Sequence, residues 1–213
     1  MARRPVYRVS DAAPYFVCET VEFAYNGGFA ASQKQKNIVA IHASFGRAHP
    51  EARVLEISTK SLQPLGVELS AFRLLKEVPS LGCRISVENV FQGGKAFTEG
   101  GPFSDLYRVS PREAKGDSRL RESGRLTAFC FEGELYPIEP KTAFYDWIYT
   151  NALLENPLLA EALTQYDAFS DVEFNPQKSI NCQAKAAAIF VSLYRLGKLD
   201  TIRSFSTFAA LYQ

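Results

Sequence analysis

The segment from Ser86 to Lys95, with the sequence SVENVFQGGK, constrains this chain more than any other stretch. On a helix, four of its residues fall at positions i, i+3, i+4 and i+7 and share one face: Glu88, Phe91, Gln92 and Lys95. Such a face is ordinarily apolar and packs into the core, but three of these four side chains are polar. Burying an acid, an amide and a lysine together costs desolvation free energy unless the stripe lines a cavity.

Two interpretations of this segment are open. One is a solvated helix face with weak pairing among Glu88, Gln92 and Lys95. The other is a helix that lines a site. Gly93 and Gly94 favour the site, because glycine weakens a helix without contributing a packed side chain.

The first part of the chain shows both strand and helix signals. Short β-branched or aromatic runs predict strands over residues 7–9, 15–17 and 54–57. Between them, Ile38, Ile41 and Phe45 form one apolar face of a helix predicted over residues 32–45.

The second part of the chain is expected to be mainly helical. Ser110, Pro111 and Glu113 supply the cap, the first-turn proline and the returning carboxylate of a capping box. Asn156 followed by Pro157 predicts another helix start. Further predicted elements are a hairpin around Gly133 and helices over roughly 182–196 and 201–211, separated near Gly197.

Length and composition favour a single globular domain. The 213 residues are enough to bury a sizeable core, and the 46% hydrophobic and 22% charged residues lie in the globular range. No repeat, low-complexity tract or linker divides the chain. We therefore expect one compact α+β domain over residues 1–213, mainly helical with a few short strands.

The chain carries no apolar run of about 18 residues, the length that a spanning helix needs. The basic N-terminus is not followed by an apolar region, so no signal peptide is predicted. Four widely spaced cysteines, Cys18, Cys83, Cys130 and Cys182, fit reduced and mostly buried thiols. Together these features predict a cytoplasmic protein with no membrane partner.

Much common catalytic machinery is missing from the sequence. We find no GxGxxG, P-loop, GxSxG, HExxH or CxxC pattern. The two histidines, His42 and His49, are too few for the usual zinc sites, so neither a metal nor a cofactor is predicted. Of these, His42 is expected to be satisfied on a structural helix. A catalytic centre would have to use carboxylates, lysines and aromatic residues.

A cluster of basic residues offers an anion site despite a formal net charge of only +1. Its members are Arg112, Lys115, Arg119, Arg121 and Arg125. Arg112, Lys115 and Arg119 lie at or near a predicted helix N-terminus, where phosphates bind well. A solvated helix face interleaved with acidic residues is the alternative.

Three motifs in order resemble the NADAR superfamily, over residues 84–195. The pattern of Glu88, then Phe91-Gln92, then Lys95 looks like the family helix written E-H-x-F-Q-x-x-K. The segment 110–115, SPREAK, with Arg119 following, is similar to the family's S-P-x-E-A-K segment. The third set comprises Trp147, then Asn156-Pro157-Leu158, and then Glu173 ahead of Pro176.

Three other segments resemble the NADAR proteins that act as antitoxins: residues 27–37, 56–61 and 174–181. Those antitoxins are paired with toxins that ADP-ribosylate guanine in DNA. The resemblance implies an N-glycosidase that acts on ADP-ribosylated DNA or guanosine and releases ADP-ribose, with a cognate ADP-ribosyltransferase toxin as functional partner. It also leaves open an N-glycosidase of phosphorylated riboflavin-pathway metabolites, or an antitoxin that binds ADP-ribose without cleaving it.

The sequence departs from the superfamily pattern at two positions. Asn89 stands where histidine is usual. Lys178 stands where many members carry an aspartate, and the customary Trp-Gly after it is absent. Lys178 is therefore a candidate for a new role, and the aspartate's role has no counterpart there.

Chemistry and resemblance together nominate the site residues. Cleavage of a ribosyl–nitrogen bond builds positive charge that a carboxylate stabilises, and a lysine of lowered pKa can instead form a Schiff base with the opened sugar. The catalytic candidates are Glu88, Lys95, Glu173 and Lys178. The substrate-binding candidates are Gln33, Lys36, Gln92, Arg112, Lys115, Arg119, Tyr145, Trp147 and Asn181. Asp171 is interpreted as a turn residue.

Overall fold

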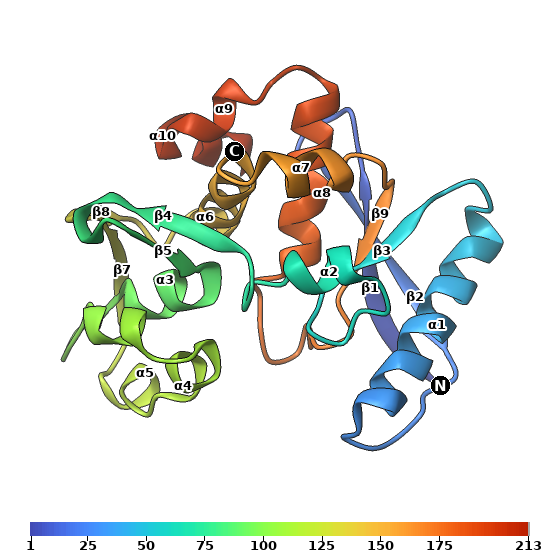
Figure 1. Cartoon of the computed structure of the whole chain (residues 1–213), viewed down its shortest axis with the longest axis horizontal. Helices are drawn as coiled ribbons and strands as arrows, with labels where there is room; N and C mark the ends of the chain where they lie inside the picture. The colour runs from blue at the N-terminus through green and yellow to red at the C-terminus, as the bar shows by residue number, and fades with distance from the viewer. Residues whose placement is uncertain (213) are drawn as a thin grey trace.

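The computed structural model describes residues 1–212 and has an α+β fold with more helix than strand, as predicted (Figure 1). Its largest sheet has the strand order β2-β1-β9-β3. The strands are β1 (Ala2–Val9), β2 (Phe16–Phe23), β3 (Val54–Glu56) and β9 (Ala168–Ser170). Strand β9 runs parallel to β3 and antiparallel to β1, so residues far apart in sequence meet in the middle of the sheet.

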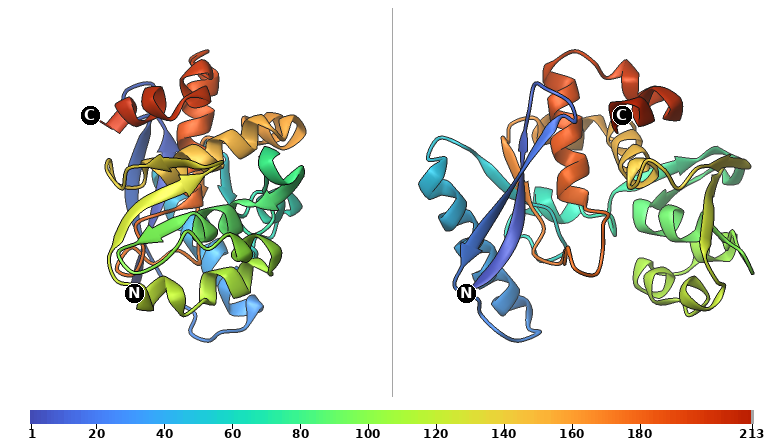
Figure 2. Two further views of the ribbon diagram at one scale, coloured as in Figure 1. Left: turned by 90° about the vertical axis from the view of Figure 1, so that its left-hand side faces the viewer. Right: turned by 180° about the vertical axis from the view of Figure 1, so that it is seen from behind.

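Helices cover both faces of this sheet. Because successive strand residues point to opposite faces, Val6 packs with helix α1 (Ala31–Ala48), whereas Tyr7 joins the main core with helix α8 (Gln183–Arg195). Helix α1 buries Ile38, Ile41 and Phe45, the face predicted from the sequence. Figure 2 shows α1 and α8 on opposite sides of the blue strands.

The middle of the chain builds a separate group of short elements, coloured green to yellow in Figure 1. Strands β4 (Leu75–Val78) and β5 (Cys83–Ser86) form a hairpin. Helix α3 (Val87–Gly93) follows directly. The remaining elements are β6 (Lys95–Phe97), the 3-10 helix η2 (Ser104–Arg108), α4 (Pro111–Gly116), α5 (Arg119–Glu122), β7 (Leu126–Phe131) and β8 (Glu134–Tyr136).

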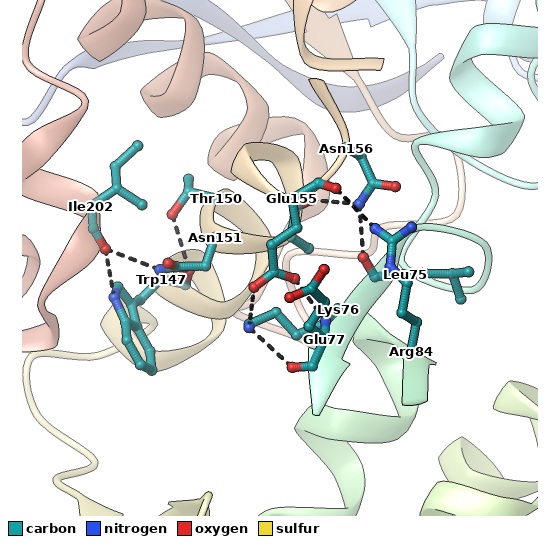
Figure 3. A network of polar contacts seen from close by, with 11 residues as sticks. Leu75, Lys76, Glu77, Arg84, Trp147, Thr150, Asn151, Glu155, Asn156 and Ile202 are labelled. Carbon is teal, nitrogen blue, oxygen red and sulfur yellow. Dashed lines mark hydrogen bonds and ion pairs between the residues drawn. The ribbon is translucent and has the colours of Figure 1, made fainter. Parts of the chain in front are cut away.

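Helix α6 (Ala143–Leu154) connects the two parts and is buried on nearly every side. It packs on α8, and α7 (Pro157–Leu163) follows it. Near the middle of α6, Trp147 Nε1 donates a hydrogen bond to the Ile202 carbonyl over 2.8 Å (Figure 3). This contact ties α6 to the C-terminal helices α9 (Asp200–Arg203) and α10 (Phe205–Ala209).

A partly buried ion pair fixes the β4–β5 hairpin against the end of α6 (Figure 3). Lys76 Nζ lies 2.5 Å from Glu155 Oε1, and the Glu77 amide donates to the other carboxylate oxygen over 2.7 Å. Arg84 donates to the Glu155 carbonyl over 3.0 Å. Since β5 leads directly into α3, these contacts also set the position of that helix.

Most predicted elements are confirmed, including the capping box of α4 and the hairpin around Gly133. Four strands escaped prediction: β4, β5, β6 and β9. The single helix predicted over 201–211 is wrong, because the chain there forms α9, α10 and the 3-10 helix η3 (Ala210–Tyr212). Ser204, extended at φ −116° and ψ 136°, separates α9 from α10.

All four cysteines are free, as predicted, but the expectation that most are buried is wrong. Only Cys182 is buried; Cys18 and Cys83 are exposed and Cys130 is intermediate. Within residues 1–212, no helix combines the length and the apolar character needed to cross a membrane.

Gly66 offers a test of the packing beside β3. It belongs to the short helix α2 (Pro64–Glu68), where a Cβ atom would lie 1.9 Å from the Glu56 carbonyl oxygen and 2.4 Å from Ser61 Oγ. We expect Gly66→Ala to lower the free energy of unfolding by about 3 kcal/mol or more, because a backbone oxygen cannot swing aside. Urea unfolding of the variant checks this.

Gly46→Ala in α1 is the matched control. A Cβ there meets nothing within 4 Å, and alanine favours a helix over glycine by roughly 0.5–1 kcal/mol. The control should therefore be slightly more stable than the wild type. Equal stability of the two variants would show that the packing at Gly66 is not as tight as described.

Candidate active site

A cavity of about 820 Å³ opens between the two parts of the molecule. One wall is formed by α3, the start of β6 and α4, and the other by the segments that follow β3 and β9. Tyr145 of α6 and Gln183 at the start of α8 also line it. In Figure 1, these are the green helices on one side and the loop after β9 on the other.

Helix α3 places a buried polar chain along the first wall. Ser86 caps the helix by accepting a hydrogen bond from the Asn89 amide, and every residue from Val87 to Gly93 is buried. Gln92 Nε2 donates to Glu88 Oε1 over 2.8 Å. The solvated face is thus excluded, and the polar stripe lines a cavity as predicted.

Lys95 does not lie on this helix, contrary to the prediction. The helix ends at Gly93, and Lys95 is the first residue of β6. Its Nζ nevertheless donates to Gln92 Oε1 over 2.6 Å and lies 4.6 Å from the Phe91 ring centroid. Gln92 therefore bridges Glu88 and Lys95 in place of a direct ion pair between them.

The two glycines before Lys95 allow neighbouring elements to pack closely against the helix. The interpretation that they have no part in packing is therefore wrong. A Cβ on Gly93 would lie 2.5 Å from a Tyr107 ring carbon, and one on Gly94 would lie 2.5 Å from the Cys130 carbonyl oxygen. Glycine lets α3 approach both η2 and β7. This approach positions the end of the helix, and with it Lys95.

The environment of Lys95 favours its neutral form. Burial lowers the pKa of Lys95 to about 8; the nearby Glu88 carboxylate opposes this shift, and Lys115 adds to it. A lysine of this pKa is a substantial nucleophile near neutral pH.

Glu88 is 4% exposed and has a cation beside it. Lys115 Nζ of α4 lies 3.5 Å from Glu88 Oε1 and 5.2 Å from the Phe72 ring centroid. Arg112, one turn earlier on α4, lines the cavity as well. The rim therefore presents two cations from α4, as expected for a site that takes phosphates.

Asn89, which replaces the family's histidine, holds the first wall together. Its Nδ2 donates to the Leu106 carbonyl over 2.6 Å and to the Val109 carbonyl over 2.9 Å. Both carbonyls lie in the segment that leads into α4. Asn89 thereby links the helix of Glu88 to the helix of Arg112 and Lys115.

The second wall carries a group of polar residues. Thr59 Oγ1 donates to Glu173 Oε2 over 3.0 Å, and Lys60 Nζ donates to the same Thr59 oxygen over 3.0 Å. Lys178 and Asn181 also line the cavity. The loop after β9 thus brings both predicted catalytic residues of that region, Glu173 and Lys178, to the wall facing α3.

Asp171 also lines this wall, although the sequence analysis did not include it among the site residues. It does form the expected turn, because its Oδ1 accepts the amides of Glu173 and Phe174 over 2.9 and 3.1 Å. Yet it is only 8% exposed and borders the cavity. Its position directly after a short run of small and apolar residues, Ala168-Phe169-Ser170, was the one available signal.

Behind Asp171 lies a buried polar network that the sequence did not suggest. Glu56, 1% exposed, accepts hydrogen bonds from the Ser170 hydroxyl and, over 2.8 Å, from the Val172 amide. His42 Nε2 lies 2.8 Å from Ser170 Oγ, and burial lowers the pKa of His42 to about 4. His42 is therefore neutral and satisfied on its helix, as predicted.

Four predicted binding residues lie outside the lining of the cavity. Gln33 and Lys36 lie on α1. Arg119 pairs with Asp105 at 2.6 Å and with Asp117 at 2.9 Å, and lies over the Phe103 ring. Trp147 is buried and bonded to α9 (Figure 3). Tyr145, two residues earlier, does line the cavity and packs edge-on against Phe91 at 5.0 Å.

Comparison with known proteins gives one finding. The family model for the DarT1-associated NADAR antitoxins matches residues 2–213. No curated protein matches the chain. The match confirms the resemblance found in the motifs and extends it over nearly the whole sequence.

Proposed function

The chain belongs to the family of DarT1-associated NADAR antitoxins, and we propose that it is an N-glycosidase that removes ADP-ribose from guanine in DNA. The observation that supports this best is the pair of hydrogen bonds that connects Glu88, Gln92 and Lys95. These bonds hold a buried carboxylate and a lysine of lowered pKa on one wall of a cavity. A cavity of about 820 Å³ is large enough for a ligand of more than one ring.

We assign to Glu88 the role of stabilising the positive charge at the reacting carbon. As the bond between the ribose C1 and the guanine nitrogen breaks, positive charge develops on C1 and the ring oxygen. A buried carboxylate, held in place by Gln92 and Lys115, stabilises that charge without having to reorganise. The same carboxylate can take a proton from the water that attacks C1.

Lys95 offers a covalent route through the same cavity. Its neutral amine attacks C1 of the opened sugar, the guanine amine leaves, and water hydrolyses the resulting Schiff base. The hydrogen bond from Lys95 to Gln92 keeps the amine beside Glu88, which can carry protons between these steps. The two routes share the carboxylate and differ in whether a lysine is modified.

Arg112 and Lys115 suit the pyrophosphate of ADP-ribose. Both come from the short helix α4, Arg112 from its first turn and Lys115 from its last. The second wall adds Lys60 and Lys178, so cations face the cavity from both sides. Tyr145 offers an aromatic surface next to Glu88.

Loss of the arginine should weaken binding specifically. We expect Arg112→Ala to bind ADP-ribose roughly tenfold more weakly, because it removes a charge-assisted contact to phosphate. Isothermal titration at two salt concentrations measures the affinity and its salt dependence. Arg121→Ala, an exposed arginine of α5 that does not line the cavity, is the control and should bind like the wild type. Equal weakening of both variants would contradict a specific clamp.

Substrate preference tests the proposed activity. The protein should cleave the ribosyl–nitrogen bond far faster in an oligonucleotide carrying ADP-ribosyl guanine than in a phosphorylated ribosyl pyrimidine, measured as kcat/KM by chromatography. The opposite preference would favour a metabolic N-glycosidase. Binding of ADP-ribose with turnover of neither substrate would favour an antitoxin that only binds.

A further inference from the structure

Asp171 is a buried acid that the mechanism above does not use. It follows β9 directly, in the middle of the largest sheet, and borders the cavity from the wall opposite Glu88. More than nine tenths of the residue is shielded from solvent. An acid in such a place costs desolvation free energy, and the fold retains it at the edge of a candidate site.

The two oxygens of Asp171 have different surroundings. Oδ1 accepts the backbone amides of Glu173 and Phe174, which fixes the orientation of the carboxyl group. Oδ2 has no hydrogen-bond partner within residues 1–212. The side chain is therefore held rigidly by one oxygen while the other remains available to a ligand.

The groups around Asp171 favour its protonated form. Burial is the main cause that raises its pKa to about 8, and the carboxylates of Glu56 and Glu173 raise it further. The two backbone amides act in the opposite direction. From α6 and from the start of α8 it faces Tyr145, Tyr149 and Cys182, whose pKa values burial and this carboxyl group raise in turn.

Tyr145 connects the two acids. It lines the same cavity as Glu88 and Asp171, and after burial, which is the main cause, the charges of both acids raise its pKa. Glu88 has a cation beside it, whereas Asp171 has carboxylates. Two acids in one cavity with such different surroundings suit different roles, one as a stabilising anion and one as a proton donor.

We propose that Asp171 is the general acid of this site and protonates the guanine nitrogen as its bond to ribose breaks; this rests on the proposed function. In this step the C1–N bond breaks, its electron pair goes to nitrogen, and the proton moves from Asp171 Oδ2 to that nitrogen. Water then adds its oxygen to C1 and gives a proton to Glu88. Proton exchange with solvent returns Glu88 and Asp171 to their starting forms.

Asp171→Asn tests this role with little structural change. An asparagine oxygen can still accept both backbone amides, but the side chain has no acidic proton. We expect the release of ADP-ribose from guanine to fall by about 100- to 10,000-fold. ADP-ribose linked at C1 to 4-nitrophenol is the matched substrate, because its leaving group needs no protonation. We expect the variant to cleave that substrate within about threefold of the wild-type rate.

The pH dependence of the rate separates a general acid from a structural residue, because loss of a purely structural residue would leave the shape of the pH profile unchanged. The release of ADP-ribose from guanine by the wild type should decline as pH rises through about 8, where Asp171 loses its proton. The variant's residual activity should lack this decline. Urea unfolding of the variant at pH 7 checks that it is folded.

Each outcome separates the hypotheses. Wild-type rates of ADP-ribose release from guanine in Asp171→Asn, or equal losses on both substrates, would overturn the general acid and leave the proposed function standing. A wild-type protein that cleaves the nitrophenyl compound but never ADP-ribosyl guanine would overturn the proposed function itself.

Discussion

Replacing Glu88 by glutamine is expected to lower the rate of ADP-ribose release by about 1,000-fold. The variant keeps the size of the side chain and an acceptor for the Gln92 amide, so the wall of the cavity stays in place. The substitution removes the negative charge that, in our proposal, stabilises the positive charge developing on the ribose C1. Because that charge matters chiefly in the transition state, the affinity for ADP-ribose should change only a few-fold. Single-turnover rates and calorimetric binding constants separate the two effects.

Glu173→Gln is the control for this prediction. Glu173 also borders the cavity, but it is exposed and already accepts a hydrogen bond from Thr59. We therefore expect a smaller loss of rate, about tenfold. If Glu88→Gln keeps full turnover while Glu173→Gln loses it, the roles of the two carboxylates are reversed. If neither substitution lowers protection against the toxin, the antitoxin acts by binding.

Lys95 should become covalently attached to the sugar when substrate and borohydride are added together. The covalent route forms a Schiff base, which borohydride reduces to a stable amine that peptide mass spectrometry can locate. Lys95→Arg should abolish the label, because the guanidinium stays protonated. The Lys178→Arg variant still contains Lys95 and should therefore still be labelled. A label on Lys178 alone would move the nucleophile to the opposite wall, and no label at all would leave only direct attack by water.

The pH dependence of this labelling has a definite sign. The pKa of Lys95 is lowered from its ordinary value to about 8, so the reactive neutral amine is scarce below pH 8 and predominates above it. The initial labelling rate should therefore rise with pH through about 8 and then level off. In Glu88→Gln the pKa of Lys95 should fall further, since the carboxylate that opposes the shift is gone.

Elements coded by neighbouring residues could be predicted from this sequence. The capping box at Ser110 and the turn at Gly133 depend on local side chains and backbone, and both are confirmed. The short strands β4 and β9 carry no clear alternation of apolar and polar residues, and β5 alternates over only four residues. Strand β9 has three residues, all buried, and is a strand because β1 and β3 pair with it. Such long-range pairing leaves no local signal.

The first wall of the site could be predicted further than the second. Glu88, Gln92 and Lys95 lie within one short segment, so their spacing revealed them even though the helix ends before Lys95. The sequence did not show which members of the basic cluster line the cavity. Asp117 is a sequence neighbour of Arg119, but Asp105 pairs with Arg119 only because the fold brings them together.

The second wall depends on the fold more heavily. Tyr145 and Trp147 are two residues apart on a helix buried on nearly every side, and only the arrangement of its neighbours shows which faces the cavity. Asp171 resembles any turn aspartate until the sheet places Glu56 behind it. Its raised pKa is a property of that arrangement and has no counterpart in the local sequence.

The mass of the oligonucleotide after reaction tests the central claim most directly. A strand carrying one ADP-ribosyl guanine is incubated with the protein in water enriched in ¹⁸O, and both products are weighed by mass spectrometry. We predict an unmodified strand and free ADP-ribose that carries the heavy oxygen on its terminal ribose. A strand that keeps ribose phosphate on guanine would mean cleavage at the pyrophosphate, and an unchanged strand would mean no cleavage; either result would contradict an N-glycosidase.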